Sequence, residues 1–294
     1  MSARIIDGKA VAARMREEIR ARAAELTSRG MTPGLGVVLV GDDPASQSYV
    51  AGKERACKEN GIFSDDHRLG ASTSAHELLS LVRRLNNDDR IHGILVQLPL
   101  PDHIDSREII EAIDPRKDVD GFHPVSVGNM VIGRDAFFPC TPHGVLHLLK
   151  RSDVKTEGAH AVIVGRSNLV GKPLANLLMR KEEGANATVT VCHSRTPEIA
   201  EHTRRADILV SAIGRPGTIT ADMVREGAVV IDVGVNRVPD ASRKRGYRLV
   251  GDVDFEPVRE KASMITPVPG GVGPMTITML LHNTVLSARR FLEG

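Results

Sequence analysis

The sequence predicts an α/β protein with two domains, each built on a parallel sheet. Short apolar runs of strand length alternate with segments of helical periodicity over residues 1–115, and the same alternation begins again at residue 160. Between them lies a polar, glycine-containing segment, DPRKDVDGFHPVSVGN (114–129), in which the pattern stops. A chain of 294 residues has room for two domains of ordinary size.

The first alternation begins with apolar residues at helical spacing, from Val11 to Leu26, and Gly30 ends this helix. Two of the strands that follow are continuously apolar, as in a sheet that is buried on both faces. The elements expected after the first helix are a strand LGVVLVG (35–41), a helix from residue 46 to the Asn-Gly pair at 60–61, a strand IFSDDHRL, a helix SAHELLSLVRRLN with Ser74 as its cap, and a strand HGILVQLPLP (92–101).

The second alternation, over residues 160–234, is that of a doubly wound unit, and a helix TPHGVLHLLKRS precedes it. Its strands and helices are expected in HAVIVG, GKPLANLLMRKEEG, ATVTVCH, TPEIAEHTRRA, DILVSAIG, ADMVREG and AVVIDVG. Residues 236–254 are polar and rich in turn residues, which predicts an exposed hairpin. The tail GPMTITMLLHNTVLSARRFLEG predicts one amphipathic helix that packs back on the first domain.

Composition excludes several classes of protein. The net charge of +2 gives no strong field for nucleic acid or a membrane surface, so neither partner is expected. The apolar runs are far shorter than a membrane span, and the N-terminus MSARIIDGKAVAARM has charges among its apolar residues, unlike a signal peptide. Cys57, Cys140 and Cys192 lack CxxC or metal-ligand spacing and are expected to be buried thiols in a reducing cytoplasm.

HAVIVGRSNLVGKP (160–173) has the order strand, glycine turn, helix start. In such a unit the pyrophosphate of a dinucleotide binds free N–H groups at the helix N-terminus. The motif departs from GxGxxG, because Ser167 follows Gly165 where the second glycine would be. A tight turn without a ligand is therefore an open alternative.

The end of the next strand, TVTVCHSRT, favours NADP over NAD. An NAD-binding unit places an acidic residue here for the ribose hydroxyls, whereas an NADP-binding unit supplies a basic residue for the 2′-phosphate. This segment has no acid but offers Ser194 and Arg195, with Arg166 in the preceding turn. Taken alone, Arg195 is equally well explained as a solvent-exposed charge in a loop, so this alternative stays open. SAIGRPG and IDVGVN end the following strands with glycines, which allow close approach to the adenosine and nicotinamide portions.

Tyr49 and Lys53 lie one helical turn apart and share one side of their helix. A tyrosine ring over the stem of an exposed lysine is a common arrangement without function, so this alternative stays open. Gln97 interrupts an apolar strand, and a buried amide needs partners either in the core or in a site.

Two further segments are candidates. KDVDG places Asp118 and Asp120 in a glycine loop between the predicted domains, either as ordinary turn residues or as ligands of magnesium. No further carboxylate cluster supports a metal, and none is expected. TPVPGGVGPMT (266–276) is either a rigid linker or a loop whose backbone lies against a ligand.

These motifs occur together, and in this order, in one family. The chain resembles the bifunctional methylenetetrahydrofolate dehydrogenase/methenyltetrahydrofolate cyclohydrolases over essentially its whole length. The matching motifs are SYVAGKERACKENGI, GILVQLPLP, DPRKDVDGFHPVSVGN, CTPHGV, VIVGRSNLVGKP, VTVCHSRT, IDVGVNR and TPVPGGVGPMTITML. The resemblance implies an N-terminal α/β domain that binds folate and carries catalysis (1–140 with 268–294), a Rossmann-like NADP-binding domain (141–267), and a homodimer formed through the nucleotide domain.

The resemblance also implies roles for single residues. Lys53 matches the catalytic lysine and Tyr49 its tyrosine, Gln97 matches the glutamine that orients the lysine, and Asp120 matches the aspartate that holds the pterin. The expected substrate contacts are Tyr49, Lys53, Val96, Gln97, Leu98, Asp120, Pro269, Gly270, Gly271, Val272 and Pro274. The expected NADP contacts are Thr141, Gly165, Arg166, Ser167, Ser194, Val235 and, from its position alone, Arg195.

The implied chemistry has two steps. A hydride passes from 5,10-methylenetetrahydrofolate to NADP, and water then attacks the methenyl carbon to give 10-formyltetrahydrofolate, with Lys53 as the proton shuttle. Two other interpretations stay open. One is a dehydrogenase without cyclohydrolase activity. The other is a polyanion- or RNA-binding module that uses SRKRGYR (242–248), whose binding would weaken steeply with salt.

Overall fold

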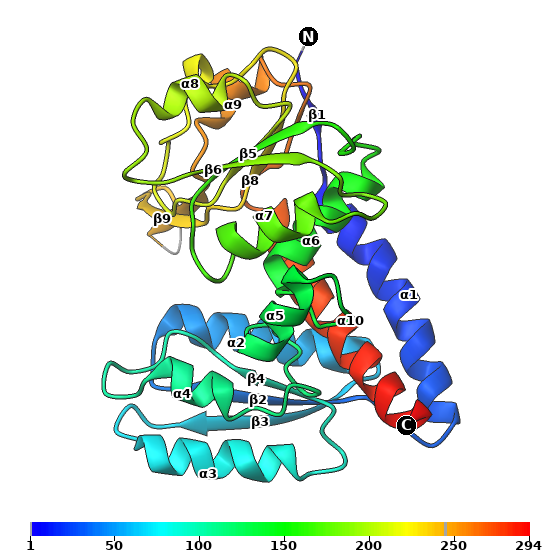
Figure 1. The fold of residues 1–294 in the computed structure, drawn as a ribbon. Coiled ribbons are helices and arrows are strands. Elements are labelled where there is room, and N and C mark those ends of the chain that lie inside the picture. Colours follow the sequence, from blue (N-terminus) through cyan, green and yellow to red (C-terminus); the bar gives the residue numbers. More distant parts are fainter. Residues whose placement is uncertain (1, 244–245) are drawn as a thin grey trace. The chain divides into compact units, whose positions relative to one another are not determined.

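The computed structural model describes residues 2–243 and 246–294, apart from the side chain of Ala45. The chain forms two compact units, which confirms the two-domain α/β prediction (Figure 1). Unit 1 comprises Met1–Ala12 and Thr141–Thr276, and unit 2 comprises Ala13–Cys140 and Ile277–Gly294.

Unit 2 is built on a three-stranded parallel sheet with the order β3-β2-β4. The central strand β2 (Gly34–Val40) is buried along its whole length, which explains its continuous apolar sequence. Strand β3 spans Phe63–Leu69 and β4 spans Gly93–Val96. Helices α2 (Pro44–Glu59) and α3 (Ala75–Asn86) lie on opposite sides of this sheet in Figure 1.

Capping residues fix where these helices begin. The carboxylate of Asp43 accepts a hydrogen bond from the N–H of Ser46 (2.7 Å) at the start of α2. Ser74 and Glu77 form a capping box at the start of α3, so the cap predicted at Ser74 is confirmed. The other helices of unit 2 are α4 (Ser106–Glu111), α5 (Pro124–Val131) and the larger parts of α1 (Gly8–Ser28) and α10 (Val272–Glu293). The C-terminal helix therefore returns to the N-terminal half of the chain, as predicted.

Unit 1 contains a six-stranded parallel sheet with the order β1-β11-β8-β7-β5-β6. The strands are β1 (Arg4–Ile5), β5 (His160–Val164), β6 (Thr188–Cys192), β7 (Ile208–Ser211), β8 (Val229–Asp232) and β11 (Met264–Ile265). The helices are α6 (Cys140–Arg151), α7 (Gly171–Met179), α8 (Ile199–Thr203) and α9 (Phe255–Arg259). The predicted hairpin is also present, with β9 (Asn236–Pro239) antiparallel to β10 (Tyr247–Val250).

Each unit has its own apolar core. In unit 1, residues of the central strands such as Val162, Leu209 and Val230 pack with residues of α8 and α9, which Figure 1 draws on one side of the sheet. In unit 2, Val38 and Ile94 pack with α3. None of the helices in the described part of the chain combines the length and the apolar character that crossing a bilayer requires.

Three details differ from the sequence analysis. The segment ADMVREG forms only a 3₁₀ turn, η1 (Ala221–Met223), and the chain then turns at Gly227 (φ 77°) before it enters β8. The two-residue strand β1 pairs with β11, so residues 1–12 join unit 1, and residues 268–276 do so as well. A strand this short has no hydrophobic pattern that a sequence can reveal. The segment SRKRGYR, proposed above as a polyanion contact, includes residues 244–245, which lie outside the described residues.

Candidate active site

A hydrogen bond joins the buried side chain of Lys53 to the partly buried side chain of Gln97 in unit 2. Lys53 projects from α2 and is 9% exposed, while Gln97 directly follows β4. The Nζ of Lys53 donates to Oε1 of Gln97 (2.9 Å), and Nε2 of Gln97 donates to the carbonyl of Leu98 (2.6 Å). Both ends of the amide are thereby used, and its acceptor end faces the lysine.

Tyr49 lies one turn before Lys53 on α2 and is half exposed. The arrangement without function, in which a tyrosine covers the stem of a solvated lysine, does not apply, because Lys53 is the buried member of the pair. This face of α2 therefore presents an exposed aromatic ring one turn away from a buried amine.

Asp120 places a carboxylate near this centre. Burial raises the pKa of its carboxyl above the ordinary value, while the charge of Lys53 and a hydrogen bond with the Cys140 thiol oppose that rise. Burial also raises the pKa of Cys140 well above its usual value. Asn283 of α10 donates to the carbonyl of Val119 (2.8 Å), next to Asp120. Sequence reasoning missed Cys140 and Asn283 as supports of this loop, because they come from distant segments.

Asp118 has a different environment from Asp120. Its carboxylate is 1% exposed and accepts from the N–H groups of His123 (2.9 Å) and Phe122 (3.2 Å) and from the hydroxyl of Ser126. Asp118 therefore shapes the loop from within. Within residues 2–243 and 246–294, no three His, Cys, Asp or Glu side chains come together as possible ligands of a metal ion.

In unit 1, the turn after β5 lies where the strand order reverses. The chain passes from β5 to its neighbour β6 and then to β7 on the other side of β5, and doubly wound sheets bind ligands at such a point. Gly165 has φ of 131°, and a Cβ there would overlap the carbonyl of Ala212. A Cβ at Gly171 would overlap the carbonyl of Gly165. Gly165 therefore allows the turn to approach the chain after β7, and Gly171 allows α7 to approach the end of β5.

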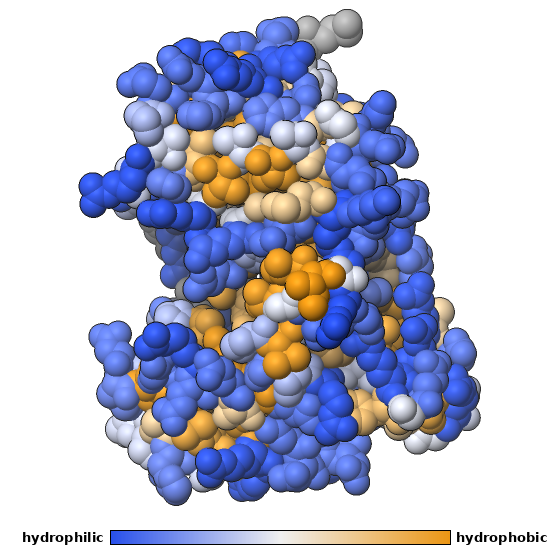
Figure 2. Space-filling model, in the orientation of Figure 1, coloured by the Kyte–Doolittle hydropathy of each residue, from blue (hydrophilic) through white to orange (hydrophobic). Residues whose placement is uncertain are grey.

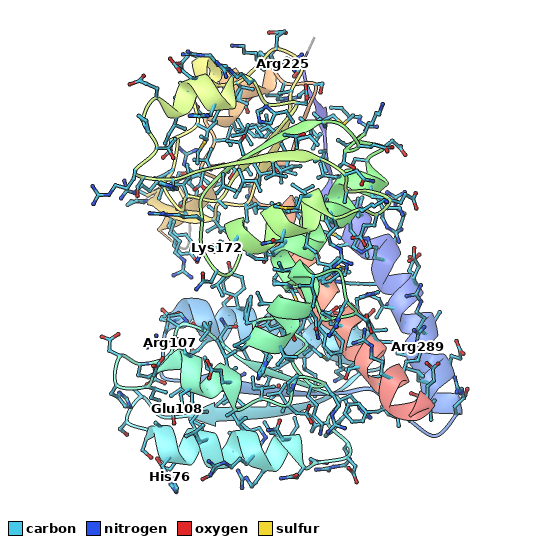
Figure 3. All side chains as sticks on the ribbon, in the orientation of Figure 1. His76, Arg107, Glu108, Lys172, Arg225 and Arg289 are labelled. Atoms are coloured by element: carbon cyan, nitrogen blue, oxygen red, sulfur yellow. The ribbon has the colours of Figure 1, made fainter. Side chains whose placement is uncertain are left out.

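Hydrogen-bond donors surround this turn. The exposed donor residues are Arg166, Ser167, Ser194 and Arg195. Because β5 and β6 are paired neighbours, the two segments that carry these residues follow adjacent strands at the same edge of the sheet. Lys172, labelled in Figure 3, lies at the start of α7, where it donates to Asn168 (2.7 Å). Guanidinium and hydroxyl donors without an acid after β6 are a set that fits phosphate groups.

The remaining candidates divide between the units. The hydroxyls of Thr141 and Thr276 are 2.9 Å apart in unit 1, and Val235, after β8, is 44% exposed. At Gly271 a Cβ would lie 2.6 Å from the carbonyl of Pro267, so the loop admits no side chain there. The candidates of the loop in unit 1 are Pro269, Gly270, Gly271, Val272 and Pro274. The substrate candidates in unit 2 are Tyr49, Lys53, Val96, Gln97, Leu98 and Asp120.

Comparison with known families covers both halves of the chain. Residues 6–120 match the tetrahydrofolate dehydrogenase/cyclohydrolase catalytic domain, and residues 139–292 match the NAD(P)-binding domain of the same family. The chain belongs to the tetrahydrofolate dehydrogenase/cyclohydrolase family. The predicted resemblance and the two-part architecture are thereby confirmed.

Individual members of this family match over full length. The bifunctional protein FolD of Moorella thermoacetica is 58% identical over 290 residues, which are 99% of this chain and 100% of that protein. The FolD protein of Bacillus subtilis is 56% identical over 293 residues, with 100% of both chains covered. The structure of the Campylobacter jejuni bifunctional enzyme has a TM-score of 0.93 and 50% identity, covering 99% of this chain and 100% of that one.

A further structure, the Trypanosoma brucei N5,N10-methylenetetrahydrofolate dehydrogenase-cyclohydrolase, was solved in complex with NADP cofactor and an inhibitor. It matches with a TM-score of 0.95 and 42% identity, and 100% of both chains is covered. A family fold known with NADP thus has the same layout as this chain.

Proposed function

We propose that this protein oxidises 5,10-methylenetetrahydrofolate with NADP and hydrolyses the resulting 5,10-methenyltetrahydrofolate to 10-formyltetrahydrofolate. The observation that carries the proposal is the hydrogen bond from the buried amine of Lys53 to Gln97 in a chain of this family. A buried amine whose hydrogen-bond acceptor is a neutral amide is suited to exchange protons, since nothing in that pair fixes its charge.

Unit 2 supplies the main folate contacts in this proposal. The carboxylate of Asp120 accepts hydrogen bonds from adjacent N–H groups on the pterin edge, and the ring of Tyr49 packs beside the amine of Lys53. Val96, Gln97 and Leu98 form the strand end next to them. The family resemblance alone assigns further folate contacts to the segment Pro269–Pro274 of unit 1, whose glycines allow a close approach of the backbone to a ligand.

Unit 1 supplies the cofactor site. Gly165, Ser167 and the N-terminus of α7 suit the pyrophosphate, while Arg166, Ser194 and Arg195 suit the 2′-phosphate. Thr141 and Val235 are the remaining proposed contacts. Bound NADP supplies the acceptor for the hydride of the one-carbon bridge. The protein's part in this step is to hold the two reactants in a productive geometry.

In the hydrolytic step the protein moves protons at Nζ of Lys53. Water that adds to the methenyl carbon has to lose a proton, and the ring nitrogen has to gain one as the C–N bond breaks. A neutral Nζ accepts the first proton, and the ammonium so formed donates one to the nitrogen, which returns the lysine to its starting state. Gln97 aims the amine without adding charge, whereas a carboxylate at that position would hold it charged.

We also propose a cytoplasmic homodimer that associates through unit 1. Three free, buried cysteines suit a reducing compartment. Strand β6 is an edge strand with half-buried Val189 and Val191. Figure 2 shows apolar side chains gathered in the part of unit 1 where Figure 1 draws β5 and β6, as expected of a surface that a second copy covers. Sedimentation equilibrium should give twice the mass of the chain.

One spectrophotometric experiment tests the proposed function. Purified protein is given methylenetetrahydrofolate with NADP or NAD, and separately methenyltetrahydrofolate without nucleotide. We expect oxidation with NADP and hydrolysis in the second assay. Oxidation without hydrolysis above the solution rate would leave a monofunctional dehydrogenase. If the protein has neither activity and binds RNA with an affinity that falls steeply as salt is added, the polyanion-binding alternative is favoured.

A further inference from the structure

Two buried aspartates, Asp232 and Asp252, lie beside the strand ends of unit 1, and the proposed chemistry does not use them. They are 3% and 0% exposed. In the part of the chain that the structure describes, the hydrogen bonds to both carboxylates come from N–H, hydroxyl and amide donors. A buried carboxylate with so many backbone donors is costly to remove, and it fixes the segments that donate to it.

Asp252 fills a concave group of three successive backbone N–H donors. The N–H groups of Ile213 (2.7 Å), Gly214 (3.1 Å) and Arg215 (2.9 Å) all point at its carboxylate, and the hydroxyl of Ser211 lies 3.3 Å away. Ser211 is the last residue of β7, and Ile213, Gly214 and Arg215 lie in the turn directly after it. Such an arrangement of N–H groups binds anions. Here the anion is a side chain of the protein, so these donors are not available to a phosphate of NADP.

The same carboxylate also holds the turn after β8. Nδ2 of Asn236 donates to Oδ1 of Asp252 (3.0 Å), and Asn236 directly follows Val235, a proposed cofactor contact. A Cβ at Gly234 would overlap the carboxylate of Asp252. The glycine in this turn is therefore required by Asp252, and the two turns that follow β7 and β8 share one buried support.

Asp232 in turn fixes the backbone that carries Asp252. Its carboxylate accepts from the N–H groups of Asp252 (3.0 Å), Val253 (2.9 Å) and Gly234 (3.0 Å). A Cβ at Gly251 would overlap it. A cavity of about 550 Å³ lies beside this network, lined in part by Asp232, Gly251, Val268 and, from the β7 turn, Pro216 and Gly217. The turn after β7 therefore lines a cavity, and its conformation determines which ligand atoms fit there.

We propose that Asp252 is a positioning residue for NADP: it occupies the N–H groups after β7, holds Asn236 after β8, and so fixes both turns in the form that the cofactor meets. This inference rests on the proposed NADP-dependent function of unit 1. It assigns no contact between Asp252 and NADP, since the side chain has no exposed surface. The cofactor experiences Asp252 only through the shape of the two turns.

The test uses Asp252→Asn in the full-length protein, because this change keeps the size of the side chain and removes its charge. The asparagine cannot accept all the N–H groups that the carboxylate accepts. We expect the KM for NADP, and the Kd measured by NADPH fluorescence, to rise about ten- to a hundredfold, the effect of losing one charge-assisted hydrogen bond. Hydrolysis of methenyltetrahydrofolate without nucleotide should keep its wild-type rate. This second readout separates positioning of the cofactor from general damage to the fold.

Two further variants complete the design. Glu226→Gln changes an exposed carboxylate elsewhere in unit 1 and should leave both activities and the KM for NADP unchanged. Ser211→Ala removes one neutral donor to Asp252 from a position with 0% exposure, which NADP cannot touch. We expect it to raise the KM for NADP about two- to tenfold, and it gives a readout if Asp252→Asn does not fold.

The outcomes distinguish this inference from the proposed function. If the wild type lacks oxidation or hydrolysis, the proposed function is wrong. If the wild type has both and Asp252→Asn binds NADP with wild-type affinity, only the inference is wrong. Equal loss of oxidation and hydrolysis in Asp252→Asn and no change in the KM for NADP in Ser211→Ala would also overturn it, because Asp252 would then be a residue of general stability.

Discussion

Lys53 and Gln97 are 44 residues apart in sequence, and a 2.9 Å hydrogen bond joins Nζ of one to Oε1 of the other. The lysine comes from helix α2, and the glutamine directly follows strand β4. The neutral acceptor fixes the place of the amine without adding a charge beside it. This distinguishes the pair from a buried lysine–carboxylate ion pair, in which the charge itself is the stabilising element.

The Lys53→Met variant should lose hydrolysis far more completely than oxidation. Methionine keeps much of the stem and its packing but has no amine. Proton transfer commonly contributes about 10²–10⁴-fold to a rate, whereas hydride transfer depends mainly on how the reactants are placed. Methenyltetrahydrofolate should then accumulate during turnover, visible in its absorbance. Lys58→Met, on an exposed position of the same helix, is the matched control. Hydrolysis by Lys53→Met at the wild-type rate would falsify the proton shuttle.

The Gln97→Glu variant should show what a charged partner does. The side chain keeps its shape, but its carboxylate holds the ammonium of Lys53 in the charged form. We expect slower hydrolysis and a rate–pH profile displaced to higher pH, with the KM for NADP unchanged. Gln97→Ala should be slower without such a displacement, because the amine is then only poorly aimed. Identical profiles for the two variants would mean that the neutrality of residue 97 is irrelevant.

The Asp120→Asn variant should weaken folate binding in both reactions. The amide places a donor where the pterin edge also has a donor, and losing a charged hydrogen bond costs about 1.5–3 kcal/mol. The KM for folate should therefore rise about ten- to a hundredfold in both assays, while NADPH titration gives a wild-type Kd. If folate affinity is unchanged, Asp120 is a turn residue only. Asp102→Asn, in an exposed position, is a suitable control.

The preference for NADP should depend on Arg166 and Arg195. Each guanidinium that contacts the 2′-phosphate contributes about 1.5–3 kcal/mol, so the wild type should use NADP at least about tenfold more efficiently than NAD. Arg166→Ala and Arg195→Ala should each reduce this ratio by lowering kcat/KM with NADP and not with NAD. Arg205→Ala removes an exposed arginine elsewhere in unit 1 and should not change the ratio. Equal use of both cofactors by the wild type would contradict the assignment.

The Asp118→Asn variant should remove one pH dependence of stability. Burial raises the pKa of Asp118 from its ordinary value to about 6. The folded protein therefore keeps a proton that the unfolded chain releases, so this group stabilises the fold below about pH 4 and loses that effect as the pH rises through about 6. The free energy of unfolding of the wild type, relative to the variant, should fall by roughly 2 kcal/mol between about pH 4 and pH 7. Denaturant titrations at several pH values measure this difference, and a constant difference would contradict it.

Local patterns predicted most of the fold. The continuously apolar β2, the capped α3 and the alternation after β5 each follow from interactions within a few residues, and such interactions are visible in a sequence. Strand β1 is the counter-example. Arg4 and Ile5 are a strand only because Met264 and Ile265 offer an edge to pair with, and no local pattern records a partner so far along the chain.

The candidate site shows the same division. The one-turn spacing of Tyr49 and Lys53 is a local signal, and the polar Gln97 in an apolar strand is another. The support of the Asp120 loop by Cys140 and Asn283 depends on tertiary packing. The network around Asp252 also depends on tertiary packing, because it joins the ends of β7, β8 and β10 and the start of β9. Its only sequence sign is the pair of glycine-containing motifs, DVGVN and VGDVD, whose glycines make room for the two carboxylates.

The pairing of β1 with β11 also has a consequence for synthesis of the protein. Residues 4–5 leave the ribosome first, but their partner strand is residues 264–265, and unit 2 needs residues 277–294. During translation the sheet of unit 1 lacks β11, and unit 2 lacks its part of α10, until almost the whole chain has emerged. Both units therefore reach their final form late and within a short interval. A nascent chain stalled near residue 250 would expose two incomplete cores at once. Expression of either half as a continuous fragment, cut at residue 140, should for the same reason yield aggregating protein.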